Sequence, residues 1–290
     1  MAVPFLTFFE TFASFGEKSL LLYVLCSLCG KNKEMKIATW NVNSINVRMP
    51  QLLGWLDAAE PDVVCFQETK AVDENFPLAA LRDAGYGAAF MGQKSYNGVA
   101  IISKFPIEDV QKNFPDDDDE APKRLIAATI KGVRIVNTYI PNGTQLGTDK
   151  FAFKLDWLQR LRRFFDETCE VNKNVLLCGD FNVAVDELDV WNVPHWTGKL
   201  HFTKPERAAM HYVKQWGFVD LFRKINGNVQ EFSWWDYREG AWQKNHGLRI
   251  DHIWTSPPLA DKCTGCRIDK SPRTLEKPSD HAPVIAEFSM

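Results

Sequence analysis

Short apolar runs, each closed by polar or turn-forming residues, recur along this chain and predict buried strands. Two such runs lie at residues 36–42 and 61–68, and their length suits strands. The segment between them, residues 48–60, offers a helix, with Pro50 tolerated in its first turn. The pattern therefore predicts a strand–helix–strand opening.

Further strands are indicated downstream by the same kind of pattern. Residues 97–103 follow an Asn-Gly turn signal, and the runs 124–130 and 133–140 flank Lys131 and Gly132, which predicts a hairpin. Additional strands are predicted at residues 174–178, 231–235, 248–255 and 283–288.

The clearest helical pattern covers residues 149–170, and a second helix is predicted at 204–216. Helices alternate with strands early in the chain and hairpins lie between them, which indicates helices that cover packed sheets. We therefore predict an α/β (α+β) fold with one domain at residues 35–290. In the first helix, apolar residues recur at three- and four-residue steps: Phe151, Leu155, Leu158, Leu161, Phe165 and Cys169.

The first 34 residues differ from the rest of the chain. Their apolar segment at residues 19–29 is too short to span a bilayer, and no Lys or Arg precedes Lys18, as a secretory signal would require. Met35 then opens a strand-like run. We predict that residues 1–34 are an extension outside the fold; a short membrane-associating leader is the alternative.

Composition narrows the class of protein only a little. A hydrophobic content of 45% suits a sizeable core. The net charge of −3 argues mildly against a basic nucleic-acid binder, but five negative charges lie in residues 116–120, so the balance neither supports nor excludes a polyanionic partner.

The cysteines indicate a reduced compartment rather than a disulfide framework. Seven cysteines, an odd number, are scattered over the long chain, which favours a cytoplasmic location. Two CxxC pairs, Cys26 with Cys29 and Cys263 with Cys266, could imitate a zinc site. They lie far apart in the sequence, whereas zinc ligands usually sit in compact modules, so we do not predict zinc.

Polar residues able to hold a metal or a phosphate follow six of the apolar runs. Asp180 and Asn182 are two residues apart, and a strand would point both to the same side. An isolated residue of this kind is usually a cap or a solvated group. Six such places indicate a shared site, because carboxylates and amides supply the oxygen ligands of magnesium and manganese. The other members of the set are Asn41, Asn43, Glu68, Tyr139, Asn142, Asp251, Asp280 and His281.

Seven motifs carry a resemblance to a known family. They are, in order, WNVNS, PDVVCFQETK, GQKSYNGVAI, GDFNVA, FSWWDYR, GLRIDHI and EKPSDHAPV. With them the chain resembles the exonuclease III family of DNA-repair nucleases, within the superfamily that includes DNase I, inositol phosphatases and sphingomyelinases. The resemblance covers residues 35–290. It implies a four-layered α/β sandwich, with two mixed β-sheets packed face to face, helices outside and an active site at one end.

The resemblance also implies a metal site and a hydrolytic centre. Glu68 matches the main metal ligand, and Asn41 and Asp280 match residues that complete the site. Asp180 matches the acid/base residue near the attacking water, and some schemes let it bind metal. Asn182 matches a residue that holds a phosphate oxygen and orients the nucleophile. The full set of expected metal-site residues is Asn41, Glu68, Asp180, Asn182, Asp280 and His281.

The remaining catalytic residues are implied in the same way. His281 matches a histidine that contacts the scissile phosphate, and Asp251 the carboxylate that pairs with it. Tyr139 matches a tyrosine near the phosphate. Asp251 could instead form a structural ion pair with Arg249.

Substrate contacts are expected around this centre. Trp234 matches an aromatic residue that walls a pocket for a flipped-out baseless sugar, with Leu248 and Ile250 completing the wall; the FSWWDYR motif could also be simple core. The loop at residues 190–202 brings His195, Trp196 and His201, which could face DNA or pack. Asn43, Asn142 and Arg124 complete the expected substrate-binding residues, and Arg48, Lys70, Lys94 and Arg124 are candidates for backbone contact.

These inferences predict a Mg²⁺-dependent phosphodiesterase of base-excision repair, with Mn²⁺ able to substitute. It is expected to act as a 3′→5′ exodeoxyribonuclease on double-stranded DNA and to cut 5′ to abasic sites. We expect a monomer without stable membrane association. The alternatives are a phospholipid or phosphoinositide phosphodiesterase or phosphatase, and a catalytically silent nucleic-acid-binding protein.

Overall fold

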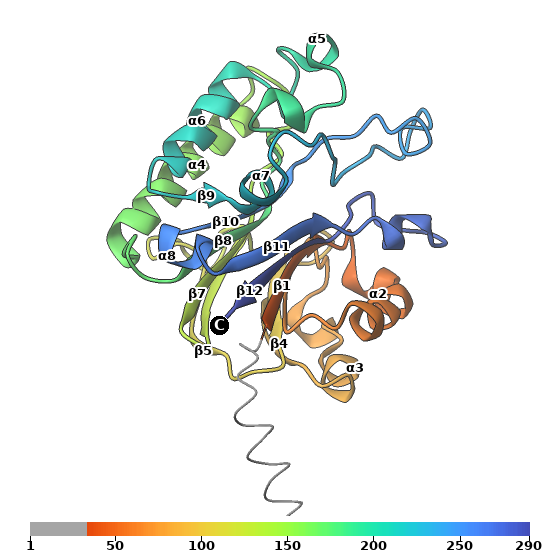
Figure 1. The fold of residues 1–290 in the computed structure, drawn as a ribbon, viewed down its shortest axis with the longest axis vertical. Coiled ribbons are helices and arrows are strands. Elements are labelled where there is room, and N and C mark those ends of the chain that lie inside the picture. The colour runs from red at the N-terminus through yellow and green to blue at the C-terminus, as the bar shows by residue number, and fades with distance from the viewer. Residues whose placement is uncertain (1–33) are drawn as a thin grey trace, which may run out of the picture.

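Two six-stranded sheets occupy the middle of the molecule (Figure 1). The structure, a computed structural model, describes residues 34–290, so the expected extension at 1–34 lies almost wholly outside the described residues. The first sheet has the order β11-β12-β1-β2-β4-β3. Its strands are β1 (Glu34–Asn41), β2 (Val63–Gln67), β3 (Gly87–Met91), β4 (Val99–Ser103), β11 (Cys263–Ile268) and β12 (Val284–Ser289).

The second sheet has the order β5-β6-β7-β8-β10-β9. Both sheets are mixed, because each contains one parallel pair, β1 with β2 and β7 with β8, among antiparallel neighbours. The strands of this sheet are β5 (Glu108–Lys112), β6 (Leu125–Ile130), β7 (Val133–Tyr139), β8 (Val175–Asp180), β9 (Val219–Asp220) and β10 (Asp251–Thr255).

Helices cover the outer faces of the two sheets. Figure 1 shows α2 and α3 beside β1 and β4, and α4 and α6 on the opposite side of the molecule. The helices are α2 (Ile45–Ala59), α3 (Leu78–Asp83), α4 (Asp149–Thr168), α5 (Val193–Trp196), α6 (Lys204–Lys214), α7 (Leu221–Asn226) and α8 (Pro257–Ala260). Short 3₁₀ turns occur at Asp73–Asn75, Glu187–Asp189 and Ser271–Thr274.

Three apolar layers hold this arrangement together. Between the sheets, Ile37, Val63, Ile135 and Leu176 belong to one fully buried cluster. A second cluster packs α4 on the outer face of β8, and a third packs α2 on the outer face of β1 and β2. All five residues of β2 are buried, because this central strand is covered on both faces. The predicted four-layered sandwich is confirmed.

Two of the expected strands are corrected by the structure. Residues 231–235 form no regular strand; Trp234 makes only single bridges, to Leu248 and to His281. β10 begins at Asp251 instead of residue 248. The apolar character of both segments reflects packing of Phe232, Trp235 and Leu248 into the core, not pairing within a ladder.

Other features bear on the earlier alternatives. β1 begins at Glu34, one residue before the expected start of the domain. Cys263 and Cys266 are free thiols at β11, and Cys26 and Cys29 lie outside the described residues. Among residues 34–290, no helix is long and apolar enough to cross a membrane.

Candidate active site

Strand register brings polar residues of both sheets to one end of the sandwich. Asp180, the last residue of β8, is paired with Tyr139 on one side and with Asp251 on the other. In the other sheet, Asn41 ends β1 beside Gln67, and Glu68 follows directly. These strand ends face each other, so residues far apart in sequence share one site.

Backbone geometry directs Asp180, Glu68 and Asn182 into the site. Gly179 has φ 137°, and a Cβ there would lie 1.8 Å from the carbonyl oxygen of Thr138, so no other residue fits before Asp180. Glu68 and Asn182 have φ of 50° and 53° and leave their strands in left-handed conformations. Non-glycine residues adopt this conformation at a cost, and such residues gather at functional sites.

The Asn41 side chain connects the two sheets at this point. Its Nδ2 donates to Oε1 of Glu68 at 2.8 Å and to Oδ2 of Asp180 at 2.9 Å. Lys70 Nζ lies 2.8 Å from Oε2 of Glu68. Burial would raise the pKa of Glu68, but the charge of Lys70 and the hydrogen bonds from Asn41 and Lys70 outweigh it and lower that pKa. Glu68 is therefore held as a carboxylate.

Asp180 is buried among other acidic groups. Burial, with the charges of Asp251 and Glu68, raises its pKa to about 7, although His281 and Asn41 oppose the shift. The backbone N–H of Asn182 donates to Asp180 Oδ1 at 2.8 Å, and the Asn182 side-chain amide donates to Oδ2 at 3.2 Å. This carboxyl group is placed to take up a proton near neutral pH.

His281 and Asp251 form a buried pair beside Asp180. His281 Nδ1 donates to Asp251 Oδ2 at 2.9 Å, and its Nε2 lies 3.7 Å from Asp180 Oδ2. Burial would lower the pKa of His281, but the carboxylates of Asp251 and Asp180 raise it to about 10. Ser233 Oγ donates to Asp251 at 2.7 Å. The alternative pairing of Asp251 with Arg249 is wrong, because the Arg249 guanidinium binds Asp189 and Asp220.

Asp280 links the site to the tryptophan wall. Its carboxylate accepts from Asn43 Nδ2 at 2.9 Å and from Trp234 Nε1 at 3.0 Å. Burial would raise the pKa of Asp280, but His281 and these two hydrogen bonds lower it. Trp234 is half-buried and packs on a small cluster that includes the fully buried Leu248 and Ile250. The motif around Trp234 thus supplies both core and site residues.

The other residues expected to contact substrate are also polar or charged. Asn142 Nδ2 donates to Asn182 Oδ1 at 3.2 Å. Arg124 lies over the Tyr139 ring, 4.6 Å from its centroid. Burial and the carboxylates of Glu68 and Asp180 raise the Tyr139 pKa well above its ordinary value, so the phenol keeps its proton. Of the remaining expected cations, Lys94 is exposed, and Arg48 donates to the Pro278 carbonyl at 3.2 Å.

The side chains present fit a divalent cation. Ligand atoms of Glu68, Asp180 and His281 lie within 4.8 Å of one another. Hard divalent ions prefer carboxylate oxygens, and His281 already uses Nδ1 for Asp251. Glu68 and Asp180 are therefore the strongest ligand candidates, and Asn41 and Asn182 are hydrogen-bonded to them. The Asp280 carboxylate binds Asn43 and Trp234 instead and is not in this group of three.

A buried ion pair beneath the site was not found from sequence. Lys154 on α4 and Glu206 on α6 are fully buried and form a salt bridge. Lys154 Nζ also donates to the backbone carbonyls of Asn142 at 3.1 Å and Asn182 at 2.8 Å. His201, which the sequence allowed either to face DNA or to pack, is buried too. Its Nδ1 donates to the same Asn182 carbonyl at 2.7 Å. The sequence pattern of the two amphipathic helices does not predict that a lysine of one pairs with a glutamate of the other.

The chain is similar to known proteins over most of its length. The model of the Endonuclease/Exonuclease/phosphatase family matches residues 38–281. Exodeoxyribonuclease III of Haemophilus influenzae is 35% identical over 88% of this chain and 100% of its own length. An AP endonuclease from Archaeoglobus fulgidus superimposes with a TM-score of 0.85 at 40% identity, over 88% of this chain and all of the other.

A second solved structure is similarly close. A 3′ phosphatase from Neisseria, bound to a product DNA hairpin, has a TM-score of 0.84 at 41% identity and covers 88% of this chain and 99% of its own. The sequence motifs and the fold agree with these likenesses. The chain therefore belongs to the endonuclease/exonuclease/phosphatase family, as a member of the exonuclease III group that the motifs predicted.

Proposed function

We propose that this protein is a Mg²⁺-dependent DNA phosphodiesterase of repair, which removes nucleotides or blocking groups from 3′ ends and cuts 5′ to abasic sites. One observation carries the proposal: Glu68, Asp180, Asp251 and His281 meet at the strand ends of both sheets, within the family whose named members include exodeoxyribonuclease III and AP endonuclease. DNA is the substrate class, since the Neisseria relative is bound to a DNA product.

The chain's own residues divide the work of hydrolysis. Asp180 accepts the proton of the attacking water, whose oxygen forms a bond to phosphorus while the bond from phosphorus to the 3′ oxygen breaks. His281, held by Asp251, donates to a phosphate oxygen from Nε2. The amides of Asn182 and Asn142 can bind the phosphate without adding negative charge.

Glu68 is the principal metal ligand in this proposal and Asn41 is hydrogen-bonded to it, while Asp280 is proposed to complete the site and Asp180 acts as the proton acceptor. The ion would neutralise negative charge on the leaving oxygen. Mn²⁺ is proposed to replace Mg²⁺, because both accept carboxylate and amide oxygens.

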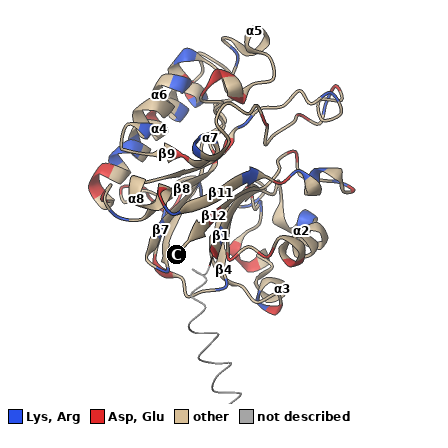
Figure 2. Ribbon diagram, viewed as in Figure 1, with Lys and Arg blue, Asp and Glu red and all other residues tan. Residues whose placement is uncertain are grey.

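DNA contact is proposed to be mainly with the phosphate backbone. Lys and Arg are distributed over several elements, including α4 and α6 (Figure 2). Binding of the DNA backbone is therefore proposed to depend on the Lys and Arg side chains that lie near the reaction centre. Arg48, Lys70, Lys94 and Arg124 are the candidates. Binding should therefore weaken as salt rises. The proposed enzyme is a cytoplasmic monomer whose catalytic domain is residues 35–290.

The proposal is tested with an end-labelled duplex that carries one internal abasic analogue, incubated with Mg²⁺ and with EDTA. A Mg²⁺-dependent product cut 5′ to the analogue supports abasic-site cleavage, and a ladder from the 3′ end supports exonuclease activity. Glu68→Gln should abolish both products, whereas Glu60→Gln, at the exposed C-terminus of α2, should not. No product from the folded wild-type protein would refute the nuclease proposal and turn attention to lipid phosphates.

A further inference from the structure

A layer of polar side chains lies between the apolar core and the reaction centre. In β1, Thr39 lies two residues before Asn41, so both point into the space between the sheets. In β7, Asn137 lies in the same way between the core residue Ile135 and Tyr139. Two residues of a strand span about 6.6 Å, so this layer lies that far towards the core from the site residues of its strands.

Gln67, the last residue of β2, completes the layer. Its Nε2 donates to Thr39 Oγ1 at 2.9 Å within the first sheet and to Asn137 Oδ1 at 2.6 Å on the second sheet. It also donates to the backbone carbonyl of Cys65 at 3.1 Å. All three side chains of the layer are fully buried. We call Thr39, Gln67 and Asn137 the polar floor.

Asn137 also binds the backbone of the first sheet. Its Nδ2 donates to the carbonyl oxygens of Phe66 on β2 at 2.9 Å and of Ala100 on β4 at 3.0 Å. One side chain of the second sheet thus holds two neighbouring strands of the first. Hydrogen bonds are directional, whereas apolar contacts are not. The polar floor therefore fixes both the separation and the register of the two sheets.

Stability alone does not explain the polar floor. Gln67 Oε1 is buried and has no hydrogen-bond partner within residues 34–290, which costs stability. The layers deeper in the same space are apolar, as at Ile135 and Val63. Replacing both partners of a buried hydrogen bond with apolar groups of similar shape can be nearly neutral. Polar side chains at this depth therefore indicate a requirement for precise placement.

The polar floor lies under both halves of the reaction centre. Gln67 directly precedes Glu68 on the first sheet. On the second sheet, Asn137 lies two residues before Tyr139, which is paired with Asp180. Ligand atoms of Glu68 and Asp180 lie within 4.8 Å of each other although they come from different sheets. Their separation therefore depends on how the sheets are held together one layer below.

We propose that Gln67 and Asn137 are positioning residues, which hold the two sheets so that Glu68 and Asp180 act on the same phosphate. The inference rests on the proposed function, because it concerns a site that both sheets form. Gln67 and Asn137 act through the strands that they join. A misplacement of about 1 Å can lower a rate by roughly 10², so the reaction is sensitive to this separation.

Asn137→Leu tests the proposal, because it keeps the branched shape of the side chain and removes its hydrogen bonds. The Kd for Mg²⁺, measured without DNA from the rise in the free energy of unfolding, should increase roughly tenfold. The kcat for the labelled duplex should fall by about 10–100-fold. Ile135→Val is the matched control: it removes a methyl group from the same face of β7 and lowers stability. It should leave the Kd and kcat unchanged.

A milder pair of variants keeps the test decisive if Asn137→Leu does not fold. Thr39→Val keeps the shape of the side chain but removes the hydroxyl that accepts from Gln67. It should raise the Kd for Mg²⁺ and lower kcat, by less than Asn137→Leu. Thr39→Ser keeps the hydroxyl and should retain the wild-type Kd and kcat.

The outcomes distinguish this inference from the function on which it rests. Wild-type Kd and kcat in both Asn137→Leu and Thr39→Val, despite lower stability, would overturn the positioning role while cleavage by the wild-type protein persists. An increase in Kd in Ile135→Val as large as that in Asn137→Leu would also overturn it. A folded wild-type protein that neither gains stability from Mg²⁺ nor cleaves DNA would instead refute the proposed function.

Discussion

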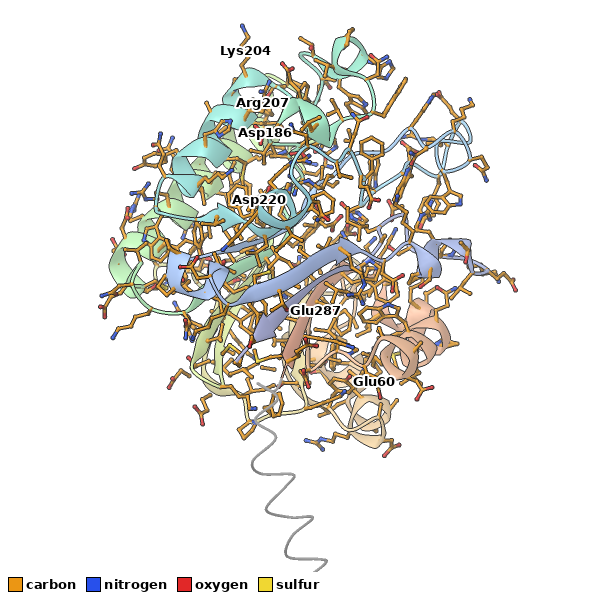
Figure 3. All side chains as sticks on the ribbon, viewed as in Figure 1. Glu60, Asp186, Lys204, Arg207, Asp220 and Glu287 are labelled. Carbon is orange, nitrogen blue, oxygen red and sulfur yellow. The ribbon has the colours of Figure 1, made fainter. Side chains whose placement is uncertain are left out.

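This protein has two buried clusters of charged side chains, and they differ in their balance of positive and negative charge. The reaction centre, formed by Glu68, Asp180, Asp251, Asp280 and His281, gathers four carboxylates around one imidazole, with Lys70 at its edge. The Arg249 cluster, formed by Asp189, Asp220, Arg223, Arg249 and His252, matches two carboxylates with two guanidinium groups. Asp220, labelled in Figure 3 where β9 leads into α7, is buried, whereas Lys204 at the start of α6 is exposed.

Burial acts on both groups, but opposite charge decides the result. In the reaction centre, burial and like charges raise the pKa of Asp180 to about 7. In the Arg249 cluster, the charge of Arg249 outweighs the burial of Asp220, and the pKa of Asp220 is lowered far below its ordinary value. Excess buried negative charge costs stability and is typical of a site that binds a cation or moves a proton. The matched cluster is structural.

Asp180→Asn should give the largest effect on activity. The variant lacks the proton acceptor, so kcat should fall by about 10²–10⁴. The free energy of unfolding should stay equal or rise, because one of several mutually repelling carboxylates is gone. Single-turnover cleavage and urea unfolding measure the two quantities. A loss of activity below tenfold would contradict the assigned role.

Arg249→Met should lower the stability of the protein and leave its activity nearly intact, the opposite of Asp180→Asn. It leaves Asp189 and Asp220 buried with their main partner removed, and unfolding free energy should fall by about 3–5 kcal/mol. The folded fraction should keep most of its cleavage activity. Urea unfolding and activity per folded molecule are the measurements. Unchanged stability would show that the cluster is not the structural element described here.

Falling pH should weaken the fold through a buried histidine of the same cluster. Burial, with the charge of Arg249, lowers the pKa of His252 from 6.5 to about 4. Between these values the unfolded chain binds a proton that the folded protein does not, so stability is lost as pH falls from about 6.5 towards 4. The expected loss at pH 5 is about 2 kcal/mol.

Urea unfolding at pH 7 and pH 5 measures this loss. His252→Gln should reduce the difference between the two pH values, even if the variant is less stable at both. His201, whose pKa is also lowered to about 4 by burial and the charge of Lys154, accounts for part of what remains. An unaltered pH difference in His252→Gln would remove this residue from the explanation.

The Lys154–Glu206 pair combines features of both clusters. Its opposite charges balance, as in the Arg249 cluster, yet it lies under the reaction centre. Lys154→Met combined with Glu206→Leu replaces the pair with apolar side chains and should retain stability better than Lys154→Met alone. The carbonyls of Asn142 and Asn182 still lose their donor. We expect kcat to fall roughly tenfold, with KM nearly unchanged. Full recovery of both stability and kcat would make the pair purely structural.

Burial explains which strands the sequence could predict. The central strands β1, β2, β7 and β8 carry apolar runs because both faces are covered. The strands that the pattern missed are the four at the edges of the sheets: β3, β5, β9 and β11. Edge strands are short or partly exposed here, and β5 has no fully buried residue, so apolar periodicity could not mark them.

The sequence predicted the right residues for the candidate site, but partly for a different structural reason from the one observed. Asp180 and Asn182 were expected to share a site as alternate residues of one strand, but β8 ends at Asp180 and a left-handed turn at Asn182 brings the amide back. The partners of Arg249 were not predicted, because Asp189 and Asp220 come from distant segments. Motifs identify residues at the reacting centre, whereas contacts such as Lys154–Glu206 depend on tertiary packing.

The most direct test of this account is the effect of Mg²⁺ on the stability of the folded protein. An ion that binds only the folded state raises the free energy of unfolding, by about 2.7 kcal/mol at 100 times its Kd. Wild-type protein and Glu60→Gln should show this rise, with cleavage appearing over the same Mg²⁺ range, and Glu68→Gln should show neither. An equal rise in Glu68→Gln, or none in the wild-type protein, would contradict the claim that the excess carboxylates form a metal site.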